Sequence, residues 1–227
     1  MTGTGSSRRC LCHQWAMFMA CLCIPLLLSC GGEAYVAMTR TPGEPLPRPD
    51  QVVVYDFAVT PGDIKLDRGV GPSMVRNMGN TTQTEEEIRV GRAVAEALAI
   101  ELVDDLQSQG IRAYRAIEAP PPSSTTLSVK GHFRKIDQGN RTTRTVVGFR
   151  LGGSQLGTSI QIYQGVGSRQ RLVSEAEAAT ESSLKPGITS LFTEAFVSAI
   201  KTDAKRTAKA IAKKFGNYYK RQGWIAK

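Results

Sequence analysis

Residues 51–57 read QVVVYDF, a compact run of β-branched and aromatic side chains that is followed by Pro61-Gly62. An apolar run of this kind is typical of a strand that is buried on both faces. We therefore expect a strand here, at the centre of a sheet. The segment that follows, up to about residue 82, is rich in Gly, Met and Asn and predicts irregular structure.

A helix is expected next along the chain. Residues 84–87 read TEEE, a capping box in which the threonine oxygen accepts from a free amide of the first turn and Glu87 reaches back. Gly110 is placed to end the helix in a left-handed conformation. Residues 111–117 then alternate with period two, which predicts a strand with one wet face. The helical stripe comprises Ile88, Val94, Ala95, Leu98, Leu102, Val103 and Leu106.

The second half of the chain predicts a meander and a final helix. Apolar and polar residues alternate over 127–134, 143–151 and 156–164, and 172–180 is expected to be the last strand. The helix after Pro186-Gly187 has an apolar stripe made of Phe192, Phe196, Ile200, Ala204, Ala208, Ile211 and Phe215. Together these elements predict an α/β (α+β) fold: a single mixed, largely antiparallel sheet, with a helix after the first strand and a long C-terminal helix packed on it.

The N-terminus has the pattern of an export signal. All five cysteines of the 227-residue chain fall within its first 30 residues, which excludes a disulfide framework in the folded body. Basic residues at 8 and 9 precede an apolar run from Trp15 to Leu28, too short for a comfortable transmembrane span. The ending Leu27-Leu28-Ser29-Cys30 resembles a bacterial lipobox, in which Cys30 receives the lipid. The alternative is an ordinary secretory signal with an incidental cysteine.

These features divide the chain into three parts. Residues 1–29 are expected to be the signal peptide, and residues 30–50 the lipidated cysteine with a stiff proline-rich linker that holds the body off the membrane. Residues 51–227 are expected to form a single α/β domain. Gly31 stands after the cysteine instead of an aspartate, which by resemblance indicates sorting to the outer membrane, with the domain facing the periplasm.

A glycine-rich stretch, GNRTTRTVVGFRLGGSQLG at 139–157, connects two expected strands. It resembles the motif of a bacterial lipoprotein family catalogued as domain of unknown function 4410, although Arg150 stands where a small residue is usual. The resemblance covers most of residues 52–212 and implies a structural role for the motif. The wider architecture is similar to small α/β modules of envelope lipoproteins, including the curli secretion lipoprotein and activators of peptidoglycan synthases. The matching positions are Gly139, Asn140, Arg141, Arg144, Val147, Gly148, Phe149, Gly152 and Ser154.

Two other functions for this stretch can be weighed from its residues. A phosphate-binding loop would need a lysine after Gly153 and a following helix, and neither is present or expected. The tracts on either side of Gly152-Gly153 are long enough for a membrane-crossing hairpin, but several copies would have to close a barrel. In the globular alternative, one face of the hairpin packs under the helices and its arginine face meets water.

Neither catalysis nor metal binding has a convincing set of residues. The body after Cys30 contains no cysteine and one histidine, His132, which is expected on a strand face. No spacing of His, Cys and carboxylates suits a metal, so we expect no catalytic residue, metal or cofactor. The net charge of +9 is concentrated in part on the final helix, as a row that is either a solvated face or a site for an anionic partner. This row comprises Lys201, Lys205, Lys209 and Lys213.

Two hypotheses about function follow. The first is a non-enzymatic envelope lipoprotein, a lipid-anchored binding or scaffold module whose partner is another envelope component. The second is a self-assembling subunit of an outer-membrane pore or secretion complex. Export excludes nucleic acid as a natural partner in both cases. An enzyme that depends on His132 is a distant third.

Overall fold

The computed structural model describes residues 34–65, 83–137, 154–182 and 193–226. The chain divides into two compact units, Met1–Gly31 and Gly32–Lys227, and every described residue belongs to the second. Two long helices are described, α3 (Gln83–Ser108) and α5 (Thr193–Arg221). The strands are β1 (Ala34–Arg40), β2 (Val52–Val54), β3 (Ile64–Lys65), β4 (Ala113–Arg115), β5 (Leu127–Asp137), β6 (Ser154–Gln164) and β7 (Arg171–Ser182).

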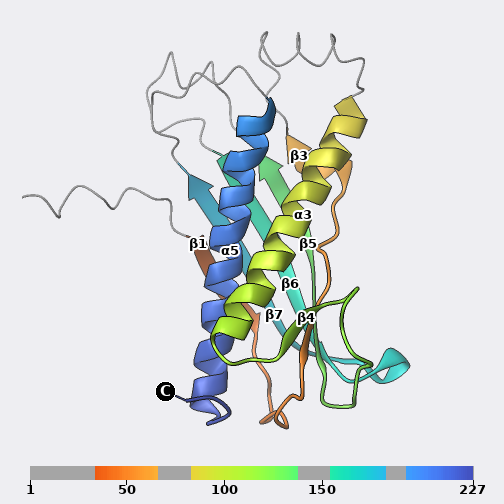
Figure 1. The fold of residues 1–227 in the computed structure, drawn as a ribbon, viewed down its shortest axis with the longest axis vertical. Coiled ribbons are helices and arrows are strands. Elements are labelled where there is room, and N and C mark those ends of the chain that lie inside the picture. Colours follow the sequence, from red (N-terminus) through yellow and green to blue (C-terminus); the bar gives the residue numbers. More distant parts are fainter. Residues whose placement is uncertain (1–33, 66–82, 138–153, 183–192, 227) are drawn as a thin grey trace, which may run out of the picture. The chain divides into compact units, whose positions relative to one another are not determined.

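The strands form one mixed sheet in the order β1-β7-β6-β5-β2-β4, with β3 paired to β5 beside this path (Figure 1). The long strands β1, β7, β6 and β5 pair antiparallel. The short strands β2, β3 and β4 are joined by parallel pairing, because a helix or a long connection separates them from their neighbours. The predicted α+β class, with a largely antiparallel sheet and a C-terminal helix, is confirmed.

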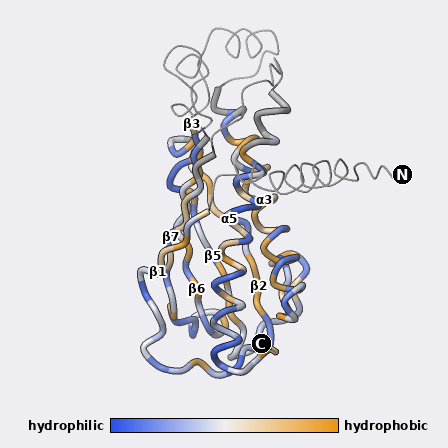
Figure 2. Tube along the Cα trace, turned by 90° about the vertical axis from the view of Figure 1, so that its left-hand side faces the viewer, coloured by the Kyte–Doolittle hydropathy of each residue, from blue (hydrophilic) through white to orange (hydrophobic). Residues whose placement is uncertain are grey.

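Both helices pack on the same face of the sheet, as the view turned by 90° shows (Figure 2). The core lies between these two layers and is built from side chains that each element turns inward. On β5 the fully buried residues are Val129 and Phe133, and a bulge after Phe133 brings Ile136 to the same face. Gly131 lies between them under the ring of Phe57, which a Cβ atom would meet at 2.5 Å. Glycine is therefore required at this point of the strand.

Helix α3 follows the predicted stripe closely. It begins at Gln83, one residue before the expected cap, and its residues Leu98, Leu102 and Leu106 are fully buried. Gly110 adopts a φ of 79°, and the amide of Ile111 donates to the carbonyl of Leu106 at 3.1 Å. This is the predicted left-handed end, which satisfies carbonyls that the last turn would otherwise leave free.

Helix α5 changes character along its length. In its first half it buries Ile200 together with small residues, and Ala204 and Ala208 allow the helix to approach the sheet closely. Thr207 and Thr180 of β7 share a buried hydrogen bond of 2.7 Å at this approach. In its last turns aromatic residues replace the alanines, and Gly223, with a φ of 70°, ends the helix.

Strand β1 corrects the expected linker. Residues 34–40 do not extend away from the domain but form the edge strand of the sheet, paired antiparallel with β7. The physical reason is an alternation that the nearby prolines obscured: Val36 is buried against the core, while Tyr35 on the opposite face is 68% exposed. Residues 34–40 therefore belong to the domain, and the proline-rich segment after them connects two strands of the same sheet.

Strand β2 is not at the centre of the sheet, as its apolar run predicted, but next to the edge strand β4. All three of its residues are nevertheless buried. Val52 and Val54 belong to the core under the helices, whereas Val53 is buried outside that cluster. Burial on both faces therefore does not require a central position. The predicted strand over 111–117 is also shorter, as β4.

The sheet face opposite the helices is polar where it is described. Lys130 of β5 lies over the rings of Tyr55 and Tyr163, with its Nζ 5.1 and 5.2 Å from their centroids. Arg134 pairs with Glu177 on β7. His132 is exposed on this face, opposite Ser159 of β6, as the alternation predicted.

Candidate binding pocket

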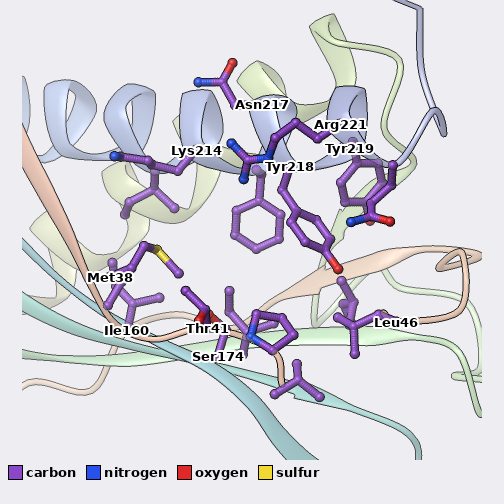
Figure 3. A pocket seen from close by; sticks show the side chains of 18 of the residues that line it. Met38, Thr41, Leu46, Ile160, Ser174, Lys214, Asn217, Tyr218, Tyr219 and Arg221 are labelled. Atoms are coloured by element: carbon purple, nitrogen blue, oxygen red, sulfur yellow. The ribbon is translucent and has the colours of Figure 1, made fainter. Parts of the chain in front are cut away.

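A large hollow lies between the last turns of α5 and the β1 side of the sheet (Figure 3). Its cavity volume is about 610 Å³, within the range of roughly 300–1,000 Å³ in which small-molecule sites fall. We call it the α5–β1 pocket. It is formed by the sheet, the helix and the loop of residues 41–46 that leaves β1.

The sheet contributes an almost entirely apolar floor. Four strands contribute to it, and the inward positions of β6 and β7 carry isoleucine, valine and alanine. Ser174 is the polar exception, and its hydroxyl donates to the carbonyl of Arg40 at 2.8 Å. The strand residues that line the pocket are Val36 and Met38 of β1, Leu127 of β5, Ile160 and Ile162 of β6, and Val173, Ser174 and Ala176 of β7.

The helix side is aromatic. Phe215 and Tyr219 are 8% and 4% exposed, and Tyr218 extends from α5 toward Leu46 in Figure 3. Beyond Gly223, the ring of Trp224 folds back edge-on to Tyr219, with the centroids 5.1 Å apart. These large rings hold the end of the helix away from the sheet, and the space between them is the pocket.

The loop of residues 41–46, TPGEPL, closes one side of the pocket. Leu46 is 8% exposed and belongs to the core, so it fastens the far end of the loop. Prolines at 42 and 45 restrict the backbone between these points. The pocket is therefore bordered by a stiff, anchored segment. A smaller hollow on the other side of this loop is lined by Arg40 and Arg171.

Charge at the pocket is confined to its rim. Lys214 and Arg221 are exposed on α5 and border the opening, while Glu44 lies on the loop. Lys214 and Arg221 are seven residues apart, which places them on one side of the helix, two turns from each other. Neither takes part in an ion pair with another residue of the described part of the chain. Two cations therefore stand beside an apolar floor, and neither is paired with an acid in the described ranges.

Tyr219 has a buried hydroxyl without a hydrogen-bond partner among the described residues. Burial raises the pKa of Tyr219 well above its ordinary value, so the hydroxyl remains protonated. The residue also borders a smaller hollow lined by Arg48, Asp50 and Arg112. A buried hydroxyl left unpaired costs stability unless water or a ligand satisfies it.

The described residues that line the pocket carry few groups for acid–base or nucleophilic chemistry. Its lining contains no histidine or cysteine, and its one serine is committed to a backbone carbonyl. An activated nucleophile would need a neighbouring base in hydrogen-bond reach. Across the ranges that the structure covers, no group of three or more His, Cys, Asp or Glu side chains could hold a metal ion.

The structure does not reach most of the residues that the sequence singled out. Cys30 and the motif positions Gly139, Asn140, Arg141, Arg144, Gly148 and Gly152 lie outside the described residues. Ser154 is the first residue of β6 and pairs in register with Ser182 of β7. Ser154 is not among the residues that line the pocket.

The lysine row on α5 is partly engaged with α3, which runs beside it (Figure 1). Lys205 forms an ion pair with Glu101 at 3.1 Å. Burial raises the pKa of Asp105, and the positive charge of Lys209 acts in the opposite direction. Lys201 is half-buried and Lys213 exposed. Two of the four lysines therefore face acidic residues of the neighbouring helix.

Sequence reasoning missed the pocket because it treated two of its walls as a linker. The alternation of residues 34–40 was the available signal, since Val36 and Met38 share the face that turns toward α5. Residues 218–224 mix aromatic and basic side chains, but composition alone does not show that Trp224 folds back onto Tyr219.

A family model identifies the family to which the chain belongs. The model described as Domain of unknown function (DUF4410) matches residues 52–190, more than half of the sequence. The chain therefore belongs to this family, as its glycine-rich motif indicated. Comparison with curated proteins gives no match.

Solved structures of distant proteins also resemble the chain. A PelC dodecamer from Paraburkholderia phytofirmans is 12% identical, with a TM-score of 0.41 over 78% of this chain and 97% of that one. Protein XCC0632 from Xanthomonas campestris, of the family DUF330, is 11% identical, with a TM-score of 0.45 over 81% and 95%. These likenesses are too distant to carry an argument about assembly or function. No helix in the described ranges combines the length and the apolar character of a membrane span.

Proposed function

We propose that the protein is a non-enzymatic lipoprotein of the bacterial cell envelope, anchored through a lipid on Cys30, whose domain binds its ligand in the α5–β1 pocket. The pocket carries the proposal: a hollow of about 610 Å³ with an apolar floor and a charged rim is the arrangement expected of a ligand site. The lipobox-like ending at Cys30 and the following glycine support anchoring at the outer membrane, facing the periplasm.

Occupancy of the pocket can be measured with single cysteines, because the chain after Cys30 contains none. Met38→Cys places a thiol in the lining, and Tyr35→Cys places one on the opposite face of the same strand. We expect a maleimide reagent to modify the thiol at position 38 several-fold more slowly in intact envelopes than in stringently delipidated protein. The rate at position 35 should be the same in both. Equal rates at position 38 would contradict a bound ligand.

Anchoring has a separate test. Cys30→Ser should abolish incorporation of labelled palmitate and release the protein from the membrane fraction. Retention of the unlabelled variant in membranes would refute the anchor. A Ser29→Ala variant is the matched control, because it keeps the cysteine and a small residue before it.

Light scattering on the purified protein distinguishes this proposal from the self-assembling alternative. A lipid-anchored binding module should give the mass of a single chain once the detergent contribution is subtracted. Stable closed rings of many chains would instead favour a subunit of a pore or secretion complex.

A further inference from the structure

We propose that the α5–β1 pocket binds an anionic amphiphile with one long acyl chain, with its charged group beside Arg221 and Lys214. The inference rests on the proposed function, because it names the class of ligand for the same pocket. It follows from three properties of the pocket: the length and chemistry of the floor, the charge of the rim, and the anchored loop.

The floor selects for a hydrocarbon chain. It joins inward residues of three adjacent strands, from Val36 on β1 to Ile160 and Ile162 on β6, to Ile211 and Phe215 on α5. Each methylene that moves from water into such an environment gains about fourfold in affinity. A long chain therefore gains far more from this floor than a short one. Branched residues on one side and aromatic rings on the other leave few polar groups for a sugar or a peptide backbone to pair with.

The rim selects for a negative head group. Arg221 and Lys214 are the cations of the lining and Glu44 is its one acid, across the opening on the loop. A guanidinium can hold a carboxylate through two parallel hydrogen bonds. In Figure 3 the Arg221 side chain runs along α5 above the hollow, with Tyr218 reaching down beside it. A head group on the helix side would thus meet both cations and keep its distance from Glu44.

The combination excludes simpler ligands. A neutral hydrocarbon would leave both cations without a counter-charge, and a small anion would leave the floor in contact with water. An amphiphile satisfies both halves of the site at once. Its chain lies under the loop of residues 41–46, which is fixed at its ends by the Ser174 hydrogen bond to Arg40 and by buried Leu46.

The test uses the intact protein in nanodiscs of neutral lipid and a palmitate that carries a photoreactive diazirine near its chain end. We expect crosslinks to map to peptides of β1, β6, β7 and the last turns of α5. Unlabelled palmitate should compete, octanoate should not at the same concentration, and hexadecanol should compete at least about fivefold more weakly than palmitate. Lysophosphatidylglycerol tests the second source of the same chemistry: the better competitor of the two anions identifies the natural head group.

Two neighbouring residues provide a matched pair for the charge. Arg221 lines the pocket, whereas the adjacent Lys220 is exposed outside it, and both lie in the last turn of α5. Arg221→Glu should reduce labelling about fivefold, and Lys214→Glu should act in the same direction. Lys220→Glu changes the net charge equally and should have no such effect.

The outcomes separate this inference from the proposed function. Crosslinks outside the elements that line the pocket, equal competition by hexadecanol, or equal losses in Arg221→Glu and Lys220→Glu would overturn the proposal of an anionic amphiphile. If the thiol of the Met38→Cys variant is nevertheless protected in envelopes, the pocket binds something else and the proposed function stands. If that thiol is freely modified in envelopes, the proposed function fails first.

Discussion

The two halves of α5 meet the same sheet in opposite ways. Between Ile200 and Ala212 the helix buries isoleucines together with alanines and Thr207, and it packs directly on β7 and against α3. From Lys214 onward its inward side chains are aromatic, and the space beneath them is hollow. The secondary structure is the same in both halves, so the difference lies in the side chains: the alanines let the helix approach the sheet closely, whereas the aromatic rings leave space.

The largest effect that tests this comparison is expected from adding the same side-chain atoms to the packed interface and to the pocket. Ala208→Leu places them where the helix is fully packed, and should lower the free energy of unfolding by about 2–3 kcal/mol. Ala176→Leu places them on the pocket floor and should change it by less than about 1 kcal/mol. Urea denaturation of both variants measures the difference. Equal losses would show that the pocket is not open space.

A smaller effect is expected at the boundary of the pocket. Tyr219→Phe removes a buried hydroxyl without a partner in the described part of the chain and should stabilise the fold by about 1 kcal/mol at neutral pH. Burial raises the folded-state pKa of Tyr219, so above the unfolded-state pKa near 10 the tyrosine ionises more readily in the unfolded chain than in the folded one. The free energy of unfolding of the wild-type protein is therefore unaffected by the ionisation of this group below pH 10 and falls as the pH rises above it. The advantage of the phenylalanine variant should therefore grow in alkaline solution. Thermal melts at pH 7 and at about pH 10.5 measure this, and a destabilised variant would mean that the hydroxyl is satisfied.

The smallest effect concerns charges on the packed half. Lys205→Ala breaks the exposed pair with Glu101 and should cost no more than about 0.5 kcal/mol at low ionic strength. The loss should disappear in about 1 M salt, where such pairs are screened. Lys213→Ala is the control, since no ion pair of Lys213 is found in the described residues. A salt-independent loss would indicate packing of the lysine stem instead.

The sequence predicted those elements whose cause is local. The leucine stripe of α3 and the left-handed Gly110 follow from helical spacing and one glycine, and both are confirmed. The alternating strands β5, β6 and β7 were found for the same reason. Pairing between strands that are distant in sequence could not be predicted in this way. Strand β1 pairs with β7 across more than a hundred residues, and residues 34–40 contain no pattern that indicates β7 as the neighbouring strand.

The pocket, like the pairing of β1 with β7, depends on segments that are distant in sequence and was therefore not predicted. Its floor joins β1, which was predicted as linker, to strands that were predicted, and the aromatic rings of α5 leave space above them. A sequence shows which side chains turn inward but not how far apart the layers stay. The anionic-partner hypothesis for the lysine row remains a prediction, although the contact of Lys205 with Glu101 reduces the free charge of that row.

The pairing of β1 also sets the length of the tether. Only Gly31, Gly32 and Glu33 separate Cys30 from the first residue of the sheet. Four fully extended residue steps span at most about 14 Å, so a lipid on Cys30 would keep the edge of the domain within that distance of the membrane surface. A domain with so short a tether would remain close to the membrane surface. It would meet membrane-borne ligands at a high effective concentration and seldom encounter those that diffuse freely in the periplasm.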